Sequence, residues 1–481
     1  MTGMLIAGER TEGAAGEGLD VVNPATEETI EAVPRGTAQD VDAAVNAAHE
    51  AFAEWSKTDA EDRANLLRKA IALIERDRKD LTMSLVREQG KPVTEAGGEV
   101  HHMIHGLNYY ADLATKVRGS YQPLPSALSK AYGMVLRRPM GVVAAIVPNN
   151  FPLTLLGTKL APALMAGNTI VVKPAATTPL TTLRIAELLL EAEFPPGVVN
   201  VITGKGSEVG DALVTHDKVR RVAFTGSTAV GRHIMGLAAP KLKRMTMELG
   251  GSDPVIVAPD ANIKAAARGI AIGRYWNCGQ MCLGGKRLYV FDAVYDALLG
   301  ELTRTVGKYE PGLGWEKAEK PNIRIGPLHT ADGRDEVMEQ LQDALDGGGE
   351  LLLGGDKPDG PGYFMQPTIV ANPPHDSRVA REETFGPVLP VWRVSDLDEA
   401  IALANDSEYG LGASVWTNDV RIIHRVANEV EAGMKWVNQF HYGYDELPFG
   451  GVKQSGYGKE HGMEGLDYYL EDISVVVGGL E

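Results

Sequence analysis

The segment GVVAAIVPNNFPLTLLGTKLAPALMAGNTIVVK, residues 141–173, decides the fold class. Its first apolar run, 142–147, is rich in Val, Ile and Ala and predicts a buried strand, and Thr169–Lys173 predicts a second one. Apolar residues from Leu153 onward predict a helix between them. A strand, a helix and a second strand in this order form a right-handed crossover, which places both strands parallel in one sheet.

The alternation of strands and helices continues beyond this segment. A parallel sheet built in this way is the usual platform for a dinucleotide. The sequence therefore predicts one α/β unit up to about Gly250 and a second one after it. The predicted strands are Val198–Ile202, Val219–Phe224, Met245–Leu249, Val255–Val257, Arg287–Phe291 and Pro367–Val370, and the predicted helices begin near Pro179, Ser207 and Ser227 or cover 261–276, 293–307 and 333–347.

Amphipathic helices precede the first parallel strands. Apolar residues at helical spacing predict a helix over 38–56 and a second one after it. A third helix, within 95–116, carries histidines, of which His101 and His105 lie one turn apart. Zincin helices place two ligands at this spacing, but His102 occupies the position of their catalytic glutamate and no third ligand is evident. We therefore expect a partly exposed helix face and no metal site.

The composition limits the class of protein. The 481 residues are enough for about three domains that each bury a core, and the formal net charge of −17 argues against nucleic acid or an anionic membrane as a partner. Two cysteines cannot form a disulfide framework and are a poor zinc pattern, so a reducing compartment is expected. The N-terminus does not resemble a signal peptide, and no apolar run reaches 18 residues. We expect a cytoplasmic protein that does not span a membrane.

Both cysteines lie in YWNCGQMCLGGKR, residues 275–287. Glycines closely precede and follow Cys282, and small neighbours allow backbone N–H groups and a ligand to approach its sulfur. Because thiolate attacks carbonyl carbon well, Cys282 is a candidate nucleophile. The alternative, for a cysteine taken alone, is a small buried apolar residue. We interpret Cys278 as a packing residue, with a disulfide to Cys282 under oxidation as the alternative.

Two further polar residues follow predicted strands. Glu248 lies in MELGG, residues 247–251, before glycines that keep the loop open. A carboxylate at the end of a strand in such a loop is a candidate general base. Asn150 lies in a polar elbow after the strand 142–147, and its amide could donate a hydrogen bond to an oxyanion.

Phosphate-binding signals follow two predicted strands. Thr225, Gly226 and Ser227 lie where a strand turns into a helix, whose N-terminal N–H groups and dipole can receive a pyrophosphate. An ordinary helix cap is the alternative for an isolated serine. Gly206 and Gly210 also follow a strand, but their spacing departs from the standard dinucleotide fingerprint.

These pieces, taken together, resemble the aldehyde dehydrogenase superfamily from about Val22 to the C-terminus. The resemblance implies an α/β fold with a Rossmann-type cofactor domain, an α/β catalytic domain and a small β oligomerisation arm. It is carried by Asn150, Glu248, GQMC (279–282), FTGS (224–227), EETFGPV (382–388) and LPFGGVKQSGYGKE (447–460). The expected domains are residues 1–118 with 139–248 for the cofactor, residues 249–450 for catalysis, and residues 119–138 with 451–481 as oligomerisation or bridging segments.

The resemblance also implies a reaction. The Cys282 thiolate attacks an aldehyde, and the Asn150 amide and the Cys282 N–H hold the oxyanion. Hydride passes to a nicotinamide, and Glu248 activates water to hydrolyse the resulting thioester. The presence of Glu248 implies a carboxylic acid product, because relatives that acylate CoA typically lack this glutamate. Lys159 and Glu460 match positions associated with proton relay, and no metal is required.

Cofactor residues are assigned by the same resemblance. It assigns Lys173 to the adenosine ribose and Glu383 to the nicotinamide ribose. Many NAD-using relatives have, three residues after the lysine, a glutamate that repels a 2′-phosphate, whereas this chain has Ala176. NADP is therefore expected to be used at least as well as NAD. The expected cofactor site comprises Lys173, Ala176, Gly206, Gly210, Thr225, Gly226, Ser227, Glu383 and Phe385.

The substrate is expected to be an uncharged aliphatic or aromatic aldehyde. Relatives that oxidise succinate semialdehyde tend to have arginines at the positions of Thr158 and Trp276, and neither residue is basic here. Phe151 and Phe449 are expected to line the tunnel with them, and Tyr442 or Tyr444 are further candidates. A semialdehyde that carries a carboxylate is the alternative. Rival classes are a thiol hydrolase or acyltransferase without a redox cofactor, and a catalytically silent relative.

The resemblance predicts a homodimer or homotetramer. Residues 118–138 break the helical pattern, and 131–138 predicts a strand with an exposed edge. In aldehyde dehydrogenases the similar segment is an oligomerisation arm. The expected partner of this arm is the strand Ser474–Val477 of a neighbouring subunit.

Overall fold

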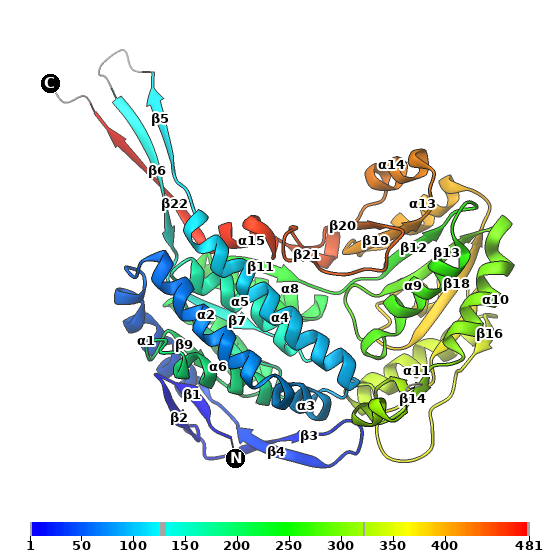
Figure 1. Ribbon diagram of the computed structural model, residues 1–481, viewed down its shortest axis with the longest axis horizontal. Helices are drawn as coiled ribbons and strands as arrows, with labels where there is room; N and C mark the ends of the chain where they lie inside the picture. The colour runs from blue at the N-terminus through cyan, green and yellow to red at the C-terminus, as the bar shows by residue number, and fades with distance from the viewer. Residues whose placement is uncertain (1, 126–130, 321–322, 479–481) are drawn as a thin grey trace.

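The computed structural model describes residues 2–125, 131–320 and 323–478. Two large sheets form two α/β halves, and a three-stranded arm projects from the first half (Figure 1). The predicted α/β fold class is confirmed. No helix in these ranges is long and apolar enough to cross a membrane.

The first half is built on an eight-stranded sheet. Its five central strands, β9, β8, β7, β10 and β11, run parallel, as the alternating pattern predicts. All residues of β7 and β8 are buried, because helices cover both faces of the sheet. In spatial order the strands are β2 (Glu9–Thr11), β1 (Met4–Ile6), β9 (Val199–Val201), β8 (Thr169–Lys173), β7 (Val142–Ile146), β10 (Val219–Thr225), β11 (Arg244–Glu248) and β21 (Gly456–Tyr457).

Helices pack on the two faces of this sheet in two groups. Five helices share a core with one face: α2 (Ala60–Arg76), α3 (Arg78–Glu88), α4 (Val93–Leu113), α5 (Pro152–Met165) and α6 (Leu180–Glu191). The other face is covered by α1 (Ala38–Trp55), α7 (Asp211–Thr215) and α8 (Thr228–Ala238). The helix predicted from Ser207 begins instead with one π-helical turn, Gly206–Gly210, before α7. A hairpin of β3 (Gly18–Val22) and β4 (Thr29–Pro34) lies beside this half.

The second half is built on a seven-stranded sheet that is parallel except at β16. The sequence pattern predicts three of its strands and misses Glu350–Leu353 and the three strands after residue 387. In spatial order the strands are β16 (Glu350–Leu353), β17 (Thr368–Ala371), β18 (Val388–Val394), β13 (Gly285–Phe291), β12 (Asp253–Val257), β19 (Gly412–Trp416) and β20 (Met434–Val437). One face packs α9 (Ile263–Tyr275), α10 (Tyr295–Val306) and α11 (Ala331–Asp346), and the other packs α13 (Leu397–Asn405) and α14 (Val420–Glu429).

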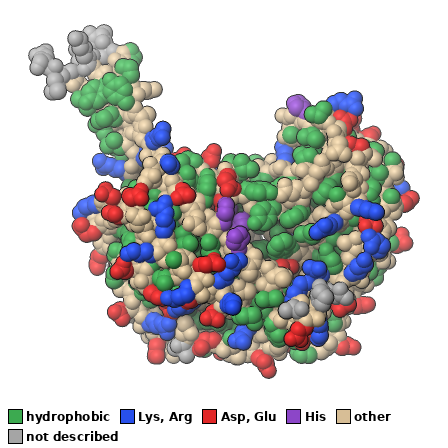
Figure 2. All heavy atoms as spheres, viewed as in Figure 1, with side chains coloured by type: hydrophobic (Ala, Val, Ile, Leu, Met, Phe, Trp, Pro, Cys, Tyr) green, Lys and Arg blue, Asp and Glu red, His purple; other side chains and the backbone are tan. Residues whose placement is uncertain are grey.

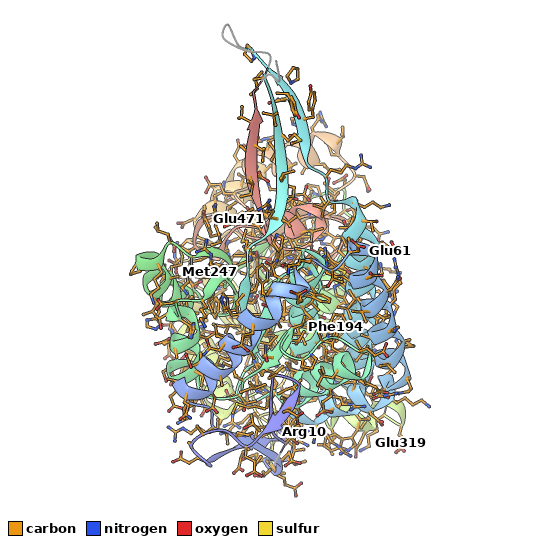
Figure 3. The ribbon with its side chains drawn as sticks, turned by 90° about the vertical axis from the view of Figure 1, so that its left-hand side faces the viewer. Arg10, Glu61, Phe194, Met247, Glu319 and Glu471 are labelled. Carbon is orange, nitrogen blue, oxygen red and sulfur yellow. The ribbon has the colours of Figure 1, made fainter. Side chains whose placement is uncertain are left out.

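The arm consists of β5 (Ser120–Leu124), β6 (Ala131–Pro139) and β22 (Leu470–Val477), in the order β22-β6-β5 (Figure 3). Within the chain, the C-terminal strand pairs with β6, from Leu470 opposite Pro139 to Val477 opposite Tyr132, so the arm already includes Ser474–Val477 of its own chain. Pairing of the other edge of β22 with a neighbouring subunit stays a prediction. Asn168 Nδ2 donates to the Tyr469 carbonyl over 2.8 Å, which anchors the chain beside β6 just before β22 begins.

Candidate active site

The expected catalytic residues lie at the ends of strands from both halves. Asn150 follows β7, next to β10, where the direction of strand order in the first sheet reverses. Ligands of open α/β sheets bind at such a switch point, outside the carboxyl ends of the strands. Glu248 ends β11, and the next residues cross into β12 of the second sheet. Cys282 lies between α9 and β13. The candidate site is therefore formed where the halves meet.

A strained turn precedes the nucleophile. Asn277, Cys278 and Gly279 have φ values of 50°, 57° and 73°, three consecutive left-handed residues. Left-handed backbone costs roughly 1 kcal/mol for a residue with a side chain. A Cβ on Gly279 would lie 2.3 Å from the Gly386 carbonyl oxygen, so this position requires glycine. A carboxylate oxygen of Glu95 accepts the Asn277 N–H over 2.8 Å and holds the turn against α4.

Asn150 is attached to this loop from the first half. Its side-chain Nδ2 donates to the Gln280 carbonyl over 3.1 Å, two residues before Cys282. The Asn150 carbonyl accepts from Lys91 Nζ over 2.7 Å and from Asn277 Nδ2 over 2.9 Å. A primary amide has two N–H donors. The contact with Gln280 therefore leaves one donor of Asn150 for a substrate oxygen.

The two cysteines have different surroundings. Cys278 is buried and Cys282 is partly exposed. Burial raises the pKa of the Cys282 thiol to about 12, although Lys286 opposes this shift. With its pKa raised in this way, the thiol is mostly protonated near pH 7. Attack by Cys282 therefore requires a group that accepts its proton.

Glu248 has the properties of such a group. Its side chain is 3% exposed, and neither carboxylate oxygen has a hydrogen-bond partner in the described part of the chain. Burial, followed by repulsion from Glu460, raises the pKa of Glu248 well above its ordinary value, while Lys159 and Lys459 lower it. A Cβ on Gly450 would lie 2.6 Å from Glu248 Oε1, so a larger residue there would displace the carboxylate.

Lys159 and Glu460 form a buried ion pair of 2.8 Å. Lys159 Nζ also donates to Thr225 Oγ1 over 2.7 Å. The hydroxyl of Thr158 donates to Glu460 Oε2 over 2.9 Å. The structure thus brings the expected relay residues Lys159 and Glu460 together. It also places beside them Thr225, expected at the cofactor, and Thr158, expected in the substrate tunnel.

The expected cofactor residues of the first half lie at the carboxyl ends of β8, β9 and β10. Lys173 is buried, its Nζ donates to the Pro174 carbonyl over 2.9 Å, and burial lowers its pKa to about 8. A Cβ on Gly210 would lie 3.7 Å from the Lys173 side chain. A Cβ on Gly226 would lie 2.5 Å from the Phe224 ring. Ser227 caps α8 by accepting the Val230 N–H over 3.4 Å. The helix cap and the pyrophosphate site, the two interpretations of this serine, therefore concern the same helix N-terminus.

Glu383 reaches the candidate site from the second half. Its Oε1 accepts the Gly251 N–H and a hydrogen bond from Lys286 Nζ, each over 3.0 Å. A Cβ on Gly250 would lie 2.4 Å from Glu383 Oε2. A partly buried carboxylate, a buried lysine and an open helix N-terminus suit ribose hydroxyls and a pyrophosphate, so these residues fit a nicotinamide dinucleotide.

Aromatic rings gather around the expected substrate path. Trp276 stacks on Phe440 with centroids 6.4 Å apart, Phe440 meets Tyr442 at 6.3 Å, and Tyr442 meets Tyr444 at 5.3 Å. Phe449 shares a small hydrophobic cluster with the partly buried Cys282. We call these five aromatic residues the aromatic row. Phe151 instead contacts Lys91, whose Nζ lies 4.0 Å from its ring centroid.

Several site contacts are not predicted from the sequence. His441 Nδ1 lies 3.0 Å from Asp253 Oδ2, both buried, and His105 Nδ1 lies 2.7 Å from Asp445 Oδ2. Figure 2 shows histidine and acidic side chains close together in the middle of the visible face. Among the described residues no three His, Cys, Asp or Glu side chains gather as a metal site. Lys286 lies in the segment 275–287, four residues after Cys282. A basic residue so close to the candidate nucleophile is the signal that could have identified it.

The chain is similar to known oxidoreductases over nearly its whole length. The model of the aldehyde dehydrogenase family matches residues 11–475. Phenylacetaldehyde dehydrogenase of Pseudomonas fluorescens is 40% identical, covering 98% of this chain and 95% of its own. The NADP(+) succinate-semialdehyde dehydrogenase of Escherichia coli is 38% identical over 98% and 97%. The crystal structure of an NAD-dependent aldehyde dehydrogenase from Sinorhizobium meliloti superposes with a TM-score of 0.96 at 37% identity, covering 99% and 94%.

Proposed function

The chain belongs to the aldehyde dehydrogenase family, and we propose that it oxidises an uncharged aliphatic or aromatic aldehyde to the carboxylic acid. The aromatic row carries this proposal. Three basic side chains near the site are already compensated: Lys91 pairs with Glu99, Lys286 with Glu383, and His441 lies against Asp253. A substrate carboxylate would lose its hydration there without a matched counter-charge, which costs several kcal/mol.

The proposed reaction uses three groups of this chain. Cys282 loses its proton to Glu248, directly or through water, and its sulfur attacks the aldehyde carbon. The remaining N–H of the Asn150 amide and the Cys282 N–H stabilise the oxyanion, and each such donor typically contributes about 3 kcal/mol to the transition state. After this proton has passed to solvent, Glu248 takes a proton from the water that hydrolyses the thioester, and the Cys282 thiolate is released.

The family uses NAD or NADP, which when bound accepts a hydride from the substrate carbon. We propose that this protein uses NADP at least as well as NAD. Lys173 supports this proposal, because its buried ammonium has the neighbouring Pro174 carbonyl as its hydrogen-bond acceptor and could pair with a 2′-phosphate. Ala176, in the turn after β8, offers no carboxylate to repel that phosphate.

Initial rates with a panel of aldehydes and both cofactors, followed as absorbance at 340 nm, test the proposal. We expect phenylacetaldehyde or a neutral aliphatic aldehyde to have a higher kcat/KM than succinate semialdehyde. The opposite preference would favour a semialdehyde with a carboxylate as the substrate, the alternative suggested by the succinate-semialdehyde dehydrogenase among the relatives. No hydride transfer to either cofactor with any aldehyde would overturn the proposal.

The arm supports a second proposal, that the protein is a homodimer or homotetramer. Its strands β22 and β5 each pair on one side within the described chain, and each leaves an edge. Tyr121 and Val476 on the arm are 64% and 66% exposed. Apolar residues on open edge strands are usually covered by another chain. Sedimentation velocity of the purified protein should show no monomer at micromolar concentration, and a stable monomer would refute the proposal.

A further inference from the structure

We propose that Lys286 is a positioning residue that fixes the nucleophile loop to the Glu383 loop and supplies the positive charge that favours the Cys282 thiolate. The inference rests on the proposed function, because it gives Lys286 a part in the same reaction. Lys286 is the second residue of β13, and its side chain is 0% exposed.

The ammonium group of Lys286 donates three hydrogen bonds. Its Nζ donates to the Gly251 carbonyl over 2.7 Å, to the Cys282 carbonyl over 2.9 Å and to Glu383 Oε1 over 3.0 Å. An ammonium has three N–H donors, so these acceptors account for all of them. One buried cation therefore joins three loops that are far apart in the sequence.

Each of the three acceptors belongs to a different part of the site. Gly251 lies on the link that follows Glu248, and its N–H also donates to Glu383. The Cys282 carbonyl belongs to the nucleophile itself. Removing Lys286 would leave the buried Gly251 carbonyl, the partly buried Cys282 carbonyl and the partly buried Glu383 carboxylate short of a donor, and such groups are costly to leave unpaired. The contacts therefore predict a precise common position for the three loops.

The charges around the thiol also support a role for Lys286. Glu383, Asp253 and Glu248 face it from three separate strands or loops and disfavour its ionisation, whereas Lys286 favours it and is the largest of these charge effects on the pKa of Cys282. The carboxylate of Asp253 is shared with His441 and the Gly412 N–H. Lys286 thus lowers the pKa of the Cys282 thiol and Glu383 raises it, although the two side chains form an ion pair.

This opposition gives a test that uses the protein without cofactor or substrate. The rate constant for alkylation of Cys282 by iodoacetamide is measured at pH 8 and 9, below the raised pKa of the thiol, where the rate is proportional to the thiolate fraction, and the modified residue is identified by tandem mass spectrometry. We expect Lys286→Met to lower this rate constant at least tenfold. Glu383→Gln should raise it, and the double variant should lie near the parent protein.

A residue that served packing alone would not shift the two single variants in opposite directions. A rate constant for folded Lys286→Met within twofold of the parent value would overturn the proposal, and so would a lower rate constant in Glu383→Gln. The second variant keeps the test decisive if Lys286→Met does not fold. Because no aldehyde is used, failure here is distinct from failure of the substrate proposal.

Discussion

Replacing Glu248 with glutamine should remove the hydrolytic base and yet stabilise the fold above pH 5. Glu248 is buried with neither carboxylate oxygen hydrogen-bonded in the described chain, and its pKa is raised well above the ordinary value of 4.5. The folded protein therefore binds the Glu248 proton more tightly than the unfolded chain does. Stability falls as pH rises from 4.5 toward the raised folded value, by about 1.4 kcal/mol per pH unit.

Glutamine at this position does not titrate, so the advantage of Glu248→Gln over the parent should grow with pH across that interval. For a half of this size, 1 kcal/mol corresponds to a change in Tm of about 2 to 4 °C. Thermal unfolding at pH 5.5, 6.5 and 7.5, at one protein concentration, measures the difference. Exposed Glu50→Gln is the control and should show no such trend. A Tm difference that stays constant or shrinks with rising pH would refute the reasoning.

The other predictions concern activity. Cys282→Ala should abolish aldehyde oxidation with the fold intact, whereas Cys278→Ala should retain most of the rate, and exchanged phenotypes would contradict the assignment of the nucleophile. Trp276→Arg should raise the kcat/KM ratio of succinate semialdehyde to a neutral aldehyde about tenfold, roughly 1.4 kcal/mol, and an unchanged ratio would show that this position does not face the substrate. Ala176→Glu should weaken NADP binding and shift preference toward NAD, measured as the ratio of kcat/KM values; no shift would place the choice elsewhere.

The order of elements in both halves follows from local patterns where strands are apolar and uninterrupted. Thr169–Lys173 has the observed bounds of β8, because a fully buried parallel strand leaves a continuous apolar run. Strands β18, β19 and β20 were not predicted, although all residues of β19 are buried. Their segments include Pro390 and Ser414, and membership of the sheet depends on pairing with β13 and β12, which lie far away in the sequence.

The candidate catalytic residues could be found because their chemistry and neighbours are local. Cys282 and Glu248 each stand beside glycines, and the family motifs supply the rest. The contacts that tune these residues could not be found in this way. Glu95 meets Asn277 across 182 positions of the chain, and Glu383 meets Lys286 across 97. Nothing in either local sequence specifies such a partner, since the fold alone brings them together.

The left-handed turn at Asn277, Cys278 and Gly279 links chemical competence to the completion of folding. Its conformation is costly on its own, and its stabilising contacts come from Glu95 and Asn150 in the first half. A chain in which the second half has folded but not yet docked lacks these contacts, so the turn relaxes and the thiol loses its oxyanion donor. Completion of the oxyanion site is in this way tied to the docking of the two halves.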